Sequence, residues 1–325
     1  METSEKTELL LLGTEKPLIT EGLAERFMIH RLISSGTLES GIASTIRAIA
    51  ICGGHEPMPS DFMLRFPQLK IIASFGVGYD HIDAVWAGQH GIIVTNTPDV
   101  LTEEVADTAL GLLLCTVREL PQAERYLRAG QWIHGSYPLT RSSLRGRCVG
   151  IVGLGRIGSA IARRLEGFGV GISYHNRNKR DVPYTYHSTL LSLAHEADIL
   201  IVVTPGGPET NSLVNYEILQ ALGPRGILIN IGRGASVDER DLIKALKSGV
   251  IYSAGLDVFT EEPNVPQELL EMENIVLLPH VGSASVETRD AMSRLLVDNL
   301  LSWKDGKGPL TPVKETPVLT HSPSA

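Results

Sequence analysis

Cysteine is scarce in this 325-residue sequence, and long hydrophobic runs are absent from it. The three cysteines, Cys52, Cys115 and Cys148, lie far apart and form no C-x-x-C pair, so the sequence encodes neither a disulfide framework nor a zinc knuckle. No apolar run approaches the ~18–20 residues of a membrane span, and the N-terminus is acidic where a signal peptide needs positive charge. We therefore expect a cytoplasmic protein with no metal site and no membrane partner.

A surplus of basic residues is also missing. The chain has 29 Lys and Arg residues against 37 Asp and Glu residues, which gives a net charge of −8. The overall field repels nucleic acid, so an anionic ligand needs a local cationic pocket. Hydrophobic residues make up 43% of the chain, and its length exceeds the roughly 250–300 residues that one core serves. We expect two folded domains, no nucleic-acid partner, and a fraying tail from Pro317 onward.

Short apolar, β-branched runs separated by helix-length segments predict an α/β fold with parallel strands. The first third predicts a smaller, flavodoxin-like α/β domain with strands at residues 9–12, 48–52, 69–75 and 91–95. The rest predicts a Rossmann-type, doubly wound parallel sheet. Its six expected strands are residues 148–152, 170–174, 199–203, 226–231, 251–256 and 275–278.

Two long helical segments mark the domain boundaries. The first spans about residues 102–128, is closed by Gly130, and contains Pro121, which we expect to kink it. The second spans residues 286–303 with no strand after it, so we expect it to return to the first domain. The predicted division is a first domain at 1–98, a central sheet domain at 99–285, and the return helix with the C-terminal tail at 286–325.

A glycine-rich turn follows the strand at residues 149–152. Gly153, Gly155 and Gly158 form a G-x-G-x-x-G pattern between that strand and a run of good helix formers. The three glycines allow a tight turn, close approach of the backbone to a pyrophosphate, and close packing of helix on strand. With this flanking context the turn predicts a dinucleotide site, whereas a glycine-rich turn in an unrelated α/β protein is the alternative.

The next strand bears on which nicotinamide cofactor binds. An NAD site usually offers an acidic residue about 20 residues after the turn to bind the ribose 2′-hydroxyl. Here residues 175–180 read His-Asn-Arg-Asn-Lys-Arg, and the first carboxylate is Asp181. Arg177 can bind a 2′-phosphate bidentately, with Asn176 and with Lys179 or Arg180 close by. We predict NADP(H) as the preferred cofactor, with NAD(H) still accepted; a solvated basic loop is the alternative.

Three more segments place chemical groups at strand ends, where open α/β sheets carry their sites. Arg233 follows one strand, Asp257 and Glu262 follow another, and His280 follows a third. Each of them alone is more often structural, but together they suit carbonyl reduction. His280 can donate a proton, Arg233 can stabilise the developing oxyanion, and Glu262 can orient the imidazole. We assign Asp257 to the nicotinamide carboxamide.

At this point the sequence resembles the D-isomer-specific 2-hydroxyacid dehydrogenase family over essentially its whole length. The resemblance rests on residues 75–83, 153–158, 230–234, 255–263 and 279–283, in that order. It implies that Arg233, Glu262 and His280 are catalytic, and that Arg233 with the backbone N–H groups of Val77 and Gly78 binds the substrate carboxylate. The cofactor-binding set is Thr108, Gly153, Leu154, Gly155, Arg156, Ile157, Gly158, Asn176, Arg177, Asn178, Thr204, Pro205, Ile231, Asp257 and Gly282.

The resemblance also implies a reaction and an assembly. The turn at residues 175–178 is similar to that of the NADP-preferring reductases of glyoxylate, hydroxypyruvate and hydroxyphenylpyruvate. The implied reaction reduces a 2-oxo acid to the D-2-hydroxy acid with NADPH. The family further implies a substrate domain built from both termini, closure over a cleft, and a homodimer. Trp132 then reaches a partner's cleft or, equally, covers a domain interface.

Two other readings stay open. One is an NAD-linked relative that acts on lactate, phosphoglycerate, formate or phosphite, against which the missing acidic residue near His175 argues. The other is a non-catalytic, nucleotide-sensing binding protein, because fold alone never proves chemistry. Substrate turnover separates the enzyme from the sensor.

Overall fold

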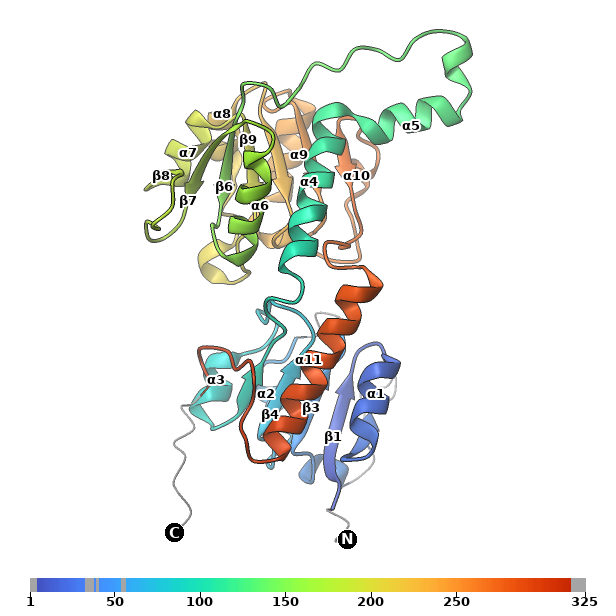
Figure 1. The fold of residues 1–325 in the computed structure, drawn as a ribbon, viewed down its shortest axis with the longest axis vertical. Helices are drawn as coiled ribbons and strands as arrows, with labels where there is room; N and C mark the ends of the chain where they lie inside the picture. The colour runs from blue at the N-terminus through green and yellow to red at the C-terminus, as the bar shows by residue number, and fades with distance from the viewer. Residues whose placement is uncertain (1–4, 33–37, 39–40, 54–56, 317–325) are drawn as a thin grey trace. The chain divides into compact units, whose positions relative to one another are not determined.

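The chain folds into two compact units, which a computed structural model describes at residues 5–32, 38, 41–53 and 57–316. Unit 1 comprises residues 1–101 and 285–325, and unit 2 comprises residues 102–284. Each unit contains one parallel β-sheet with helices (Figure 1). The predicted α/β class with two parallel sheets is therefore confirmed. The tail from Pro317, which we expected to fray, lies outside the described residues.

Unit 1 has a five-stranded sheet in the order β2-β1-β3-β4-β5, the flavodoxin-like order. Every neighbouring pair is parallel. The strands are β1 (Thr7–Leu12), β2 (Phe27–Arg31), β3 (Ala48–Ile51), β4 (Ile71–Ser74) and β5 (Ile93–Thr95). Its helices are α1 (Pro17–Ala24), α2 (Ser60–Met63), α3 (Ala84–Gln89) and α11 (Val286–Lys304), with a short turn η1 (Ile42–Ser44). The expected return helix, α11, packs on α1 and β4.

Unit 2 has a seven-stranded sheet in the order β12-β11-β10-β9-β6-β7-β8, which is doubly wound about β6 and β9. The strands are β6 (Cys148–Val152), β7 (Gly171–His175), β8 (Thr185–His187), β9 (Ile199–Val202), β10 (Ile227–Asn230), β11 (Ser253–Leu256) and β12 (Ile275–Leu277). The helices are α4 (Thr102–Arg118), α5 (Leu120–Arg128), α6 (Arg156–Glu166), α7 (Leu190–Glu196), α8 (Tyr216–Leu222), α9 (Glu239–Lys247) and α10 (Gln267–Leu270), with short turns η2 (Gln131–Ile133), η3 (Pro208–Thr210) and η4 (Gly234–Ser236).

Two edge strands and one helix break differ from the sequence prediction. β2 and β8 were not predicted, because their sequences, FMIHR and TYH, are short and partly polar and carry no continuous apolar run. The single helix predicted over residues 102–128 is wrong. The chain leaves the helix at Glu119, whose φ is 53°, and α5 begins just before Pro121, which cannot sit in a helix interior.

The cores explain why the central strands were predicted well. In unit 2, β9 and β10 are buried along their whole lengths, and the helices α7, α8 and α9 contribute their apolar faces to the same cluster. Strands buried on both faces read as continuous hydrophobic runs. Among the described residues, no helix is both long enough and apolar enough to cross a membrane.

Candidate functional site

The glycine turn of unit 2 has the geometry that a pyrophosphate needs. Gly153 has a φ of 101°, which favours glycine, and a Cβ on Gly158 would lie 2.2 Å from the carbonyl oxygen of Gly153. A Cβ on Gly155 would meet nothing within 4 Å, so the turn is open there. The helix α6 starts directly afterwards with no side-chain cap, which leaves its first N–H groups and positive dipole end for an anion. Arg156 and Ile157 form its first turn.

Asn176 and Arg180, from the loop after β7, hold this turn in place. The Oδ1 atom of Asn176 accepts a hydrogen bond from the Leu154 N–H at 2.7 Å. The Leu154 carbonyl accepts one from Arg180 Nη1 at 2.9 Å. Asn176, which we assigned to the cofactor's phosphate, thus fixes the backbone between the glycines, and its contact with the phosphate stays a prediction.

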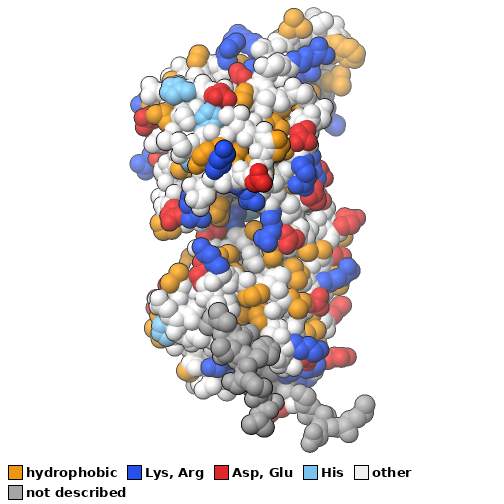
Figure 2. All heavy atoms as spheres, turned by 60° about the vertical axis from the view of Figure 1, so that its left-hand side comes forward, with side chains coloured by type: hydrophobic (Ala, Val, Ile, Leu, Met, Phe, Trp, Pro, Cys, Tyr) orange, Lys and Arg blue, Asp and Glu red, His pale blue; other side chains and the backbone are white. Residues whose placement is uncertain are grey.

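Arg177 and Asn178 lie exposed at the end of β7. The guanidinium of Arg177 pairs with the carboxylate of Glu209 in η3 at 2.7 Å, and both side chains are more than 70% exposed. Basic and acidic side chains are mixed over the face of the molecule shown in Figure 2. Sequence reasoning missed Glu209, because it follows β9, two strands further along the chain than β7, after which an NAD site usually provides its acidic residue.

His280 and Glu262 are in direct contact. The Nδ1 atom of His280 lies 2.6 Å from Oε2 of Glu262, whose Oε1 accepts a hydrogen bond from the Phe259 N–H at 3.0 Å. Because the carboxylate engages Nδ1, it fixes the ring orientation and makes Nε2 the nitrogen that can act on a substrate. His280 has a φ of 53°, an uncommon conformation for a residue other than glycine, of the kind that clusters at functional sites.

Asp257 fixes the loop that carries His280. Its side chain is 1% exposed, and its two carboxylate oxygens accept hydrogen bonds from the N–H groups of Val281 at 2.7 Å and Gly282 at 2.9 Å. Burial raises the pKa of this carboxyl, while the two N–H donors and His280 oppose the rise. Asp257 therefore acts on the histidine loop, and its contact with the nicotinamide carboxamide stays a prediction.

Arg233 is carried by a loop that Asn230 shapes. The buried Asn230 accepts the Gly232 N–H at 3.1 Å and donates to the Arg233 carbonyl at 2.9 Å. A Cβ on Gly234 would lie 1.9 Å from the carbonyl carbon of Phe259, so this loop packs tightly on the loop that leads to Glu262. The loops of Arg233, Glu262 and His280 are thus joined by direct contacts within unit 2.

The remaining cofactor candidates lie on helix α4 and on the loops after β9, β10 and β12. Thr108 donates a hydrogen bond to the carbonyl of Gly282 at 3.2 Å. The hydroxyl of Thr204 is bonded to that of Ser236 at 3.1 Å, and a Cβ on Gly282 would lie 3.6 Å from Cδ1 of Ile231. Pro205 follows Thr204, and its carbonyl accepts a hydrogen bond from the side chain of Thr210.

The loop of Val77 and Gly78 lies at the end of β4 in unit 1. Asn96 donates to the Val77 carbonyl at 2.8 Å, and the hydroxyl of Thr97 accepts the Gly76 N–H at 3.0 Å. Sequence reasoning missed Asn96, for which no motif gave a signal. The preceding residue, Phe75, has two cations near its ring: Lys16 Nζ at 4.7 Å and the guanidinium of Arg289 at 5.5 Å. An electropositive environment next to backbone N–H groups suits a carboxylate.

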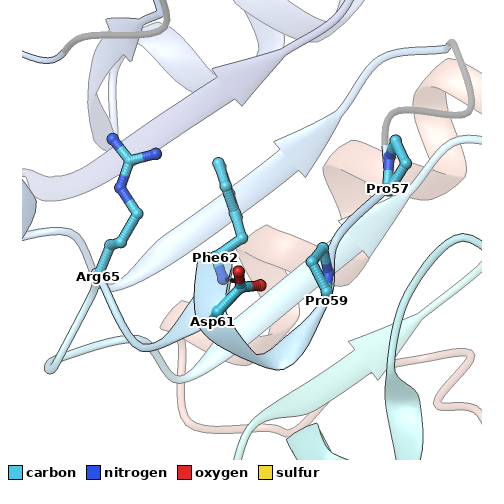
Figure 3. A pocket seen from close by; sticks show the side chains of 5 residues that line it. All are labelled: Pro57, Pro59, Asp61, Phe62 and Arg65. Atoms are coloured by element: carbon cyan, nitrogen blue, oxygen red, sulfur yellow. Dashed lines mark hydrogen bonds between the residues drawn. The ribbon is translucent and has the colours of Figure 1, made fainter.

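A surface hollow of about 260 Å³ lies elsewhere in unit 1 and has no comparable chemistry. Figure 3 shows its lining, Pro57, Pro59, Asp61, Phe62 and Arg65. The guanidinium of Arg65 stands 5.2 Å from the centre of the Phe62 ring, a packing contact. Within the described ranges, no group of three or more His, Cys, Asp or Glu residues could hold a metal ion.

The segment that carries Trp132 projects from unit 2. Figure 1 shows α5 and the loop after it extending away from the seven-stranded sheet. No residue of α5 is buried, and Trp132, Ile133 and Leu139 are 66%, 85% and 95% exposed. This is a concentrated set of exposed apolar side chains.

Comparison with known proteins agrees with these features. Residues 110–282 match the family model described as D-isomer specific 2-hydroxyacid dehydrogenase, NAD binding domain. Glyoxylate/hydroxypyruvate reductase A of Arabidopsis thaliana is 46% identical over 316 residues, covering 95% of this chain and 99% of the relative. Hydroxyphenylpyruvate reductase of Plectranthus scutellarioides is 44% identical over 308 residues, covering 94% of this chain and 98% of the relative.

A solved structure is also similar. The NADPH-dependent glyoxylate/hydroxypyruvate reductase of Sinorhizobium meliloti, crystallised in complex with NADP and malonate, has 52% sequence identity and a TM-score of 0.92. The match covers 96% of this chain and 98% of that one. The resemblance inferred from the sequence motifs is thereby confirmed.

Proposed function

Because this chain belongs to the D-isomer-specific 2-hydroxyacid dehydrogenase family, we propose that it reduces glyoxylate, hydroxypyruvate or a similar small 2-oxo acid with NADPH. The reaction converts 2-oxo acid, NADPH and one proton into the D-2-hydroxy acid and NADP⁺. The His280–Glu262 pair carries the proposal, because it supplies a proton donor and its orienting carboxylate in the same unit as the glycine turn. NADP(H) is the preferred cofactor, and NAD(H) is accepted.

The residues of unit 2 fit a dinucleotide. The open space at Gly155 and the uncapped start of α6 suit a pyrophosphate, and Arg177 suits a 2′-phosphate. Thr108, Thr204, Pro205, Ile231 and Gly282 complete the proposed cofactor surface. Bound there, the reduced nicotinamide supplies a hydride to the carbonyl carbon of the substrate.

Residues of this chain donate the proton and bind the substrate. His280 donates a proton from Nε2 to the carbonyl oxygen and is reprotonated from solvent, while Glu262 holds the ring through Nδ1. Arg233 stabilises the negative charge that builds on that oxygen and binds the substrate carboxylate. The backbone N–H groups of Val77 and Gly78 are the other proposed ligands of the carboxylate, and Lys16 and Arg289 add positive charge beside them.

A panel of 2-oxo acids tests the proposal. Glyoxylate, hydroxypyruvate, pyruvate and hydroxyphenylpyruvate are assayed separately with NADPH and with NADH, and the chirality of each product is determined. We expect the highest kcat/KM with a small 2-oxo acid and NADPH, and a D-configured product wherever the product is chiral. Tight cofactor binding without turnover of any substrate would instead indicate the nucleotide-sensing protein.

The Arg177→Ala variant tests the cofactor assignment. Loss of a charge-assisted, bidentate contact should weaken NADPH binding by about 10- to 100-fold and leave NADH binding within about twofold. Equal losses for the two cofactors would contradict the role of Arg177. Titration of the protein with each reduced cofactor, followed by nicotinamide fluorescence, measures both affinities.

The proposal extends to assembly and location. We propose a homodimer that buries the projecting segment, supported by the exposure of Trp132, Ile133 and Leu139. We also propose that the protein acts in the cytoplasm, supported by its three cysteines, all of which are free. Sedimentation equilibrium of the wild type and of the Trp132→Ala/Ile133→Ser variant tests the first part, because the variant should shift toward monomer.

A further inference from the structure

A carboxylate that the sequence near β7 lacks is supplied by a different loop. The loop after β7 offers cations and amides, whereas an NAD site usually offers an acidic residue there. In the folded chain, Oε2 of Glu209 lies 2.7 Å from Nη1 of Arg177. A group that binds the Arg177 guanidinium therefore also comes close to this carboxylate.

Glu209 is carried by a turn with internal hydrogen bonds. The turn η3 follows β9, and Pro208 restricts its first backbone angle. The hydroxyl of Thr210 donates to the carbonyl of Pro205 at 2.7 Å, and the Thr210 N–H donates to the carbonyl of Gly207 at 3.0 Å. These bonds tie Thr210, which directly follows Glu209, to the loop before the turn, and this loop contains two of the proposed cofactor residues, Thr204 and Pro205.

The two cofactors make opposite demands on such an acid–base pair. A 2′-phosphate carries negative charge and accepts hydrogen bonds, so it competes with the Glu209 carboxylate for Arg177. A ribose 2′-hydroxyl is neutral and can donate a hydrogen bond to a carboxylate, which is the interaction that an NAD site makes with its acidic residue. Separating Arg177 from Glu209 so that either side chain can bind the cofactor costs little free energy, because an ion pair this exposed is weak.

We propose that Glu209 determines how well this enzyme uses NADH, by accepting the ribose 2′-hydroxyl while it opposes the 2′-phosphate of NADPH. Arg177 and Glu209 then form one selector, in which the cation serves NADPH and the carboxylate serves NADH. The inference rests on the proposed function, because it takes the end of β7 to be where the adenosine ribose binds.

The test compares Glu209→Gln and Glu209→Ala with the wild type. The affinities for NADPH and NADH are measured by nicotinamide fluorescence, and kcat/KM is measured with each cofactor at saturating hydroxypyruvate. We expect the NADPH-to-NADH ratio of kcat/KM to rise about 5- to 20-fold in Glu209→Ala, as expected when an exposed, charged hydrogen-bond acceptor is lost and a competing charge is removed. Glu209→Gln should show the same direction with a smaller change.

The matched control is Glu217→Gln, which removes one exposed carboxylate from α8 of the same unit and should leave the ratio unchanged. A ratio that stays at the wild-type value in Glu209→Ala, or that moves as much in Glu217→Gln, overturns the inference. A ratio that falls overturns it as well, because Glu209 would then support NADPH by positioning Arg177.

Failure of the proposed function is distinguished by a binding measurement that needs no turnover. Adenosine 2′,5′-bisphosphate and adenosine 5′-monophosphate differ at the 2′ position, and calorimetry gives their affinities directly. Loss of Glu209 should raise the affinity for adenosine 2′,5′-bisphosphate and lower the affinity for adenosine 5′-monophosphate. If the wild-type protein reduces no 2-oxo acid but these shifts occur, the proposed function fails while the selector stands. If it reduces them and the shifts are absent, only the selector fails.

Discussion

The two parallel sheets present different chemistry at their carboxyl ends. In unit 1 the loop after β4 offers backbone N–H groups of Val77 and Gly78, and Asn96 and Thr97 hold its backbone through hydrogen bonds. In unit 2 the loops after β10, β11 and β12 offer the side chains of Arg233, Glu262 and His280. One architecture thus gives a backbone site suited to binding in one unit and a side-chain site suited to proton transfer in the other.

The two sites differ because the loop of unit 1 positions backbone N–H donors, whereas the loops of unit 2 orient a side chain. A backbone donor is positioned when the loop is closed by a few polar contacts, so small residues such as Gly76 and Gly78 are sufficient. A proton donor needs a defined ring orientation, so His280 requires a carboxylate on Nδ1 and a second carboxylate, Asp257, under its loop. Substitutions that loosen the proposed binding loop of unit 1 should therefore affect substrate affinity, and substitutions at the His280–Glu262 pair of unit 2 should affect turnover.

The largest expected effect is that of His280→Ala. Loss of the proposed proton donor should lower kcat by about 10²- to 10⁴-fold, the range in which general acids contribute, while the affinity for NADPH stays within about twofold. Single-turnover and steady-state assays with hydroxypyruvate, together with fluorescence titration of the cofactor, measure the two quantities.

Unit 1 provides a matched control for this change. His30 contacts the carboxylate of Glu8, a pairing of the same kind on β2 and β1. His30→Ala should leave kcat near its wild-type value. Full activity in His280→Ala, or an equal loss in His30→Ala, would remove the catalytic distinction between the two units.

A smaller effect is expected from Asn96→Ala. The substitution removes the 2.8 Å hydrogen bond to the Val77 carbonyl, so the proposed carboxylate-binding loop loses part of its support. We expect KM for the 2-oxo acid to rise about fivefold, equivalent to the net value of one hydrogen bond, while kcat and NADPH affinity change little.

Its control is Asn274→Ala in unit 2. The Asn274 amide also donates to a backbone carbonyl, that of Tyr252 at 3.2 Å. This variant should keep the wild-type KM. A loss of kcat rather than a rise in KM in Asn96→Ala would show that the loop of unit 1 does more than bind.

The smallest effect concerns stability at high pH, because both units contain tyrosine–glutamate hydrogen bonds, among them Tyr79–Glu315 in unit 1 and Tyr252–Glu119 in unit 2. Burial and the neighbouring Glu315 raise the pKa of Tyr79 to about 12, and burial with the hydrogen bond to Glu119 raises the pKa of Tyr252 to about 12. A raised pKa favours the neutral phenol in the folded state. This stabilisation is complete below the ordinary tyrosine pKa of 10 and is lost as the pH rises toward 12.

Thermal unfolding between pH 9 and pH 12 measures this loss as a falling Tm. Tyr79→Phe and Tyr252→Phe should each reduce the decline in Tm across that interval, because phenylalanine has no proton to lose. Identical curves for the wild type and both variants would mean that neither hydrogen bond contributes to the alkaline stability of its unit.

The contact between His280 and Glu262 was predicted better than the edges of the fold. It could be expected because strand ends in a parallel sheet share one edge, so topology alone can bring together residues that follow different strands. The glycine turn could be expected because its G-x-G-x-x-G pattern directly follows a strand. Asn96 and Glu209 were missed, because their contacts depend on loop conformations that no spacing rule encodes. The same limit applies to the hydrogen bond that Asn176 accepts from Leu154.

The errors in secondary structure have a common cause. Central strands such as β9 are buried on both faces and show a continuous apolar run, whereas the edge strands β2 and β8 are half covered and show none. The helix break at Glu119 was expected as a kink at Pro121. The backbone instead reverses sign in φ two residues earlier, where the chain turns into the projecting segment.

The hydrogen bonds between the loop after β7 and the glycine turn have a practical consequence for redesign. Residues 175–180 are the natural choice for randomisation in a library intended to yield an NADH-only catalyst. Asn176 and Arg180 both form hydrogen bonds with Leu154. Randomising them would therefore disturb the glycine turn as well as the selectivity between the two cofactors. A productive library keeps these two positions fixed and varies Arg177, Asn178 and Lys179.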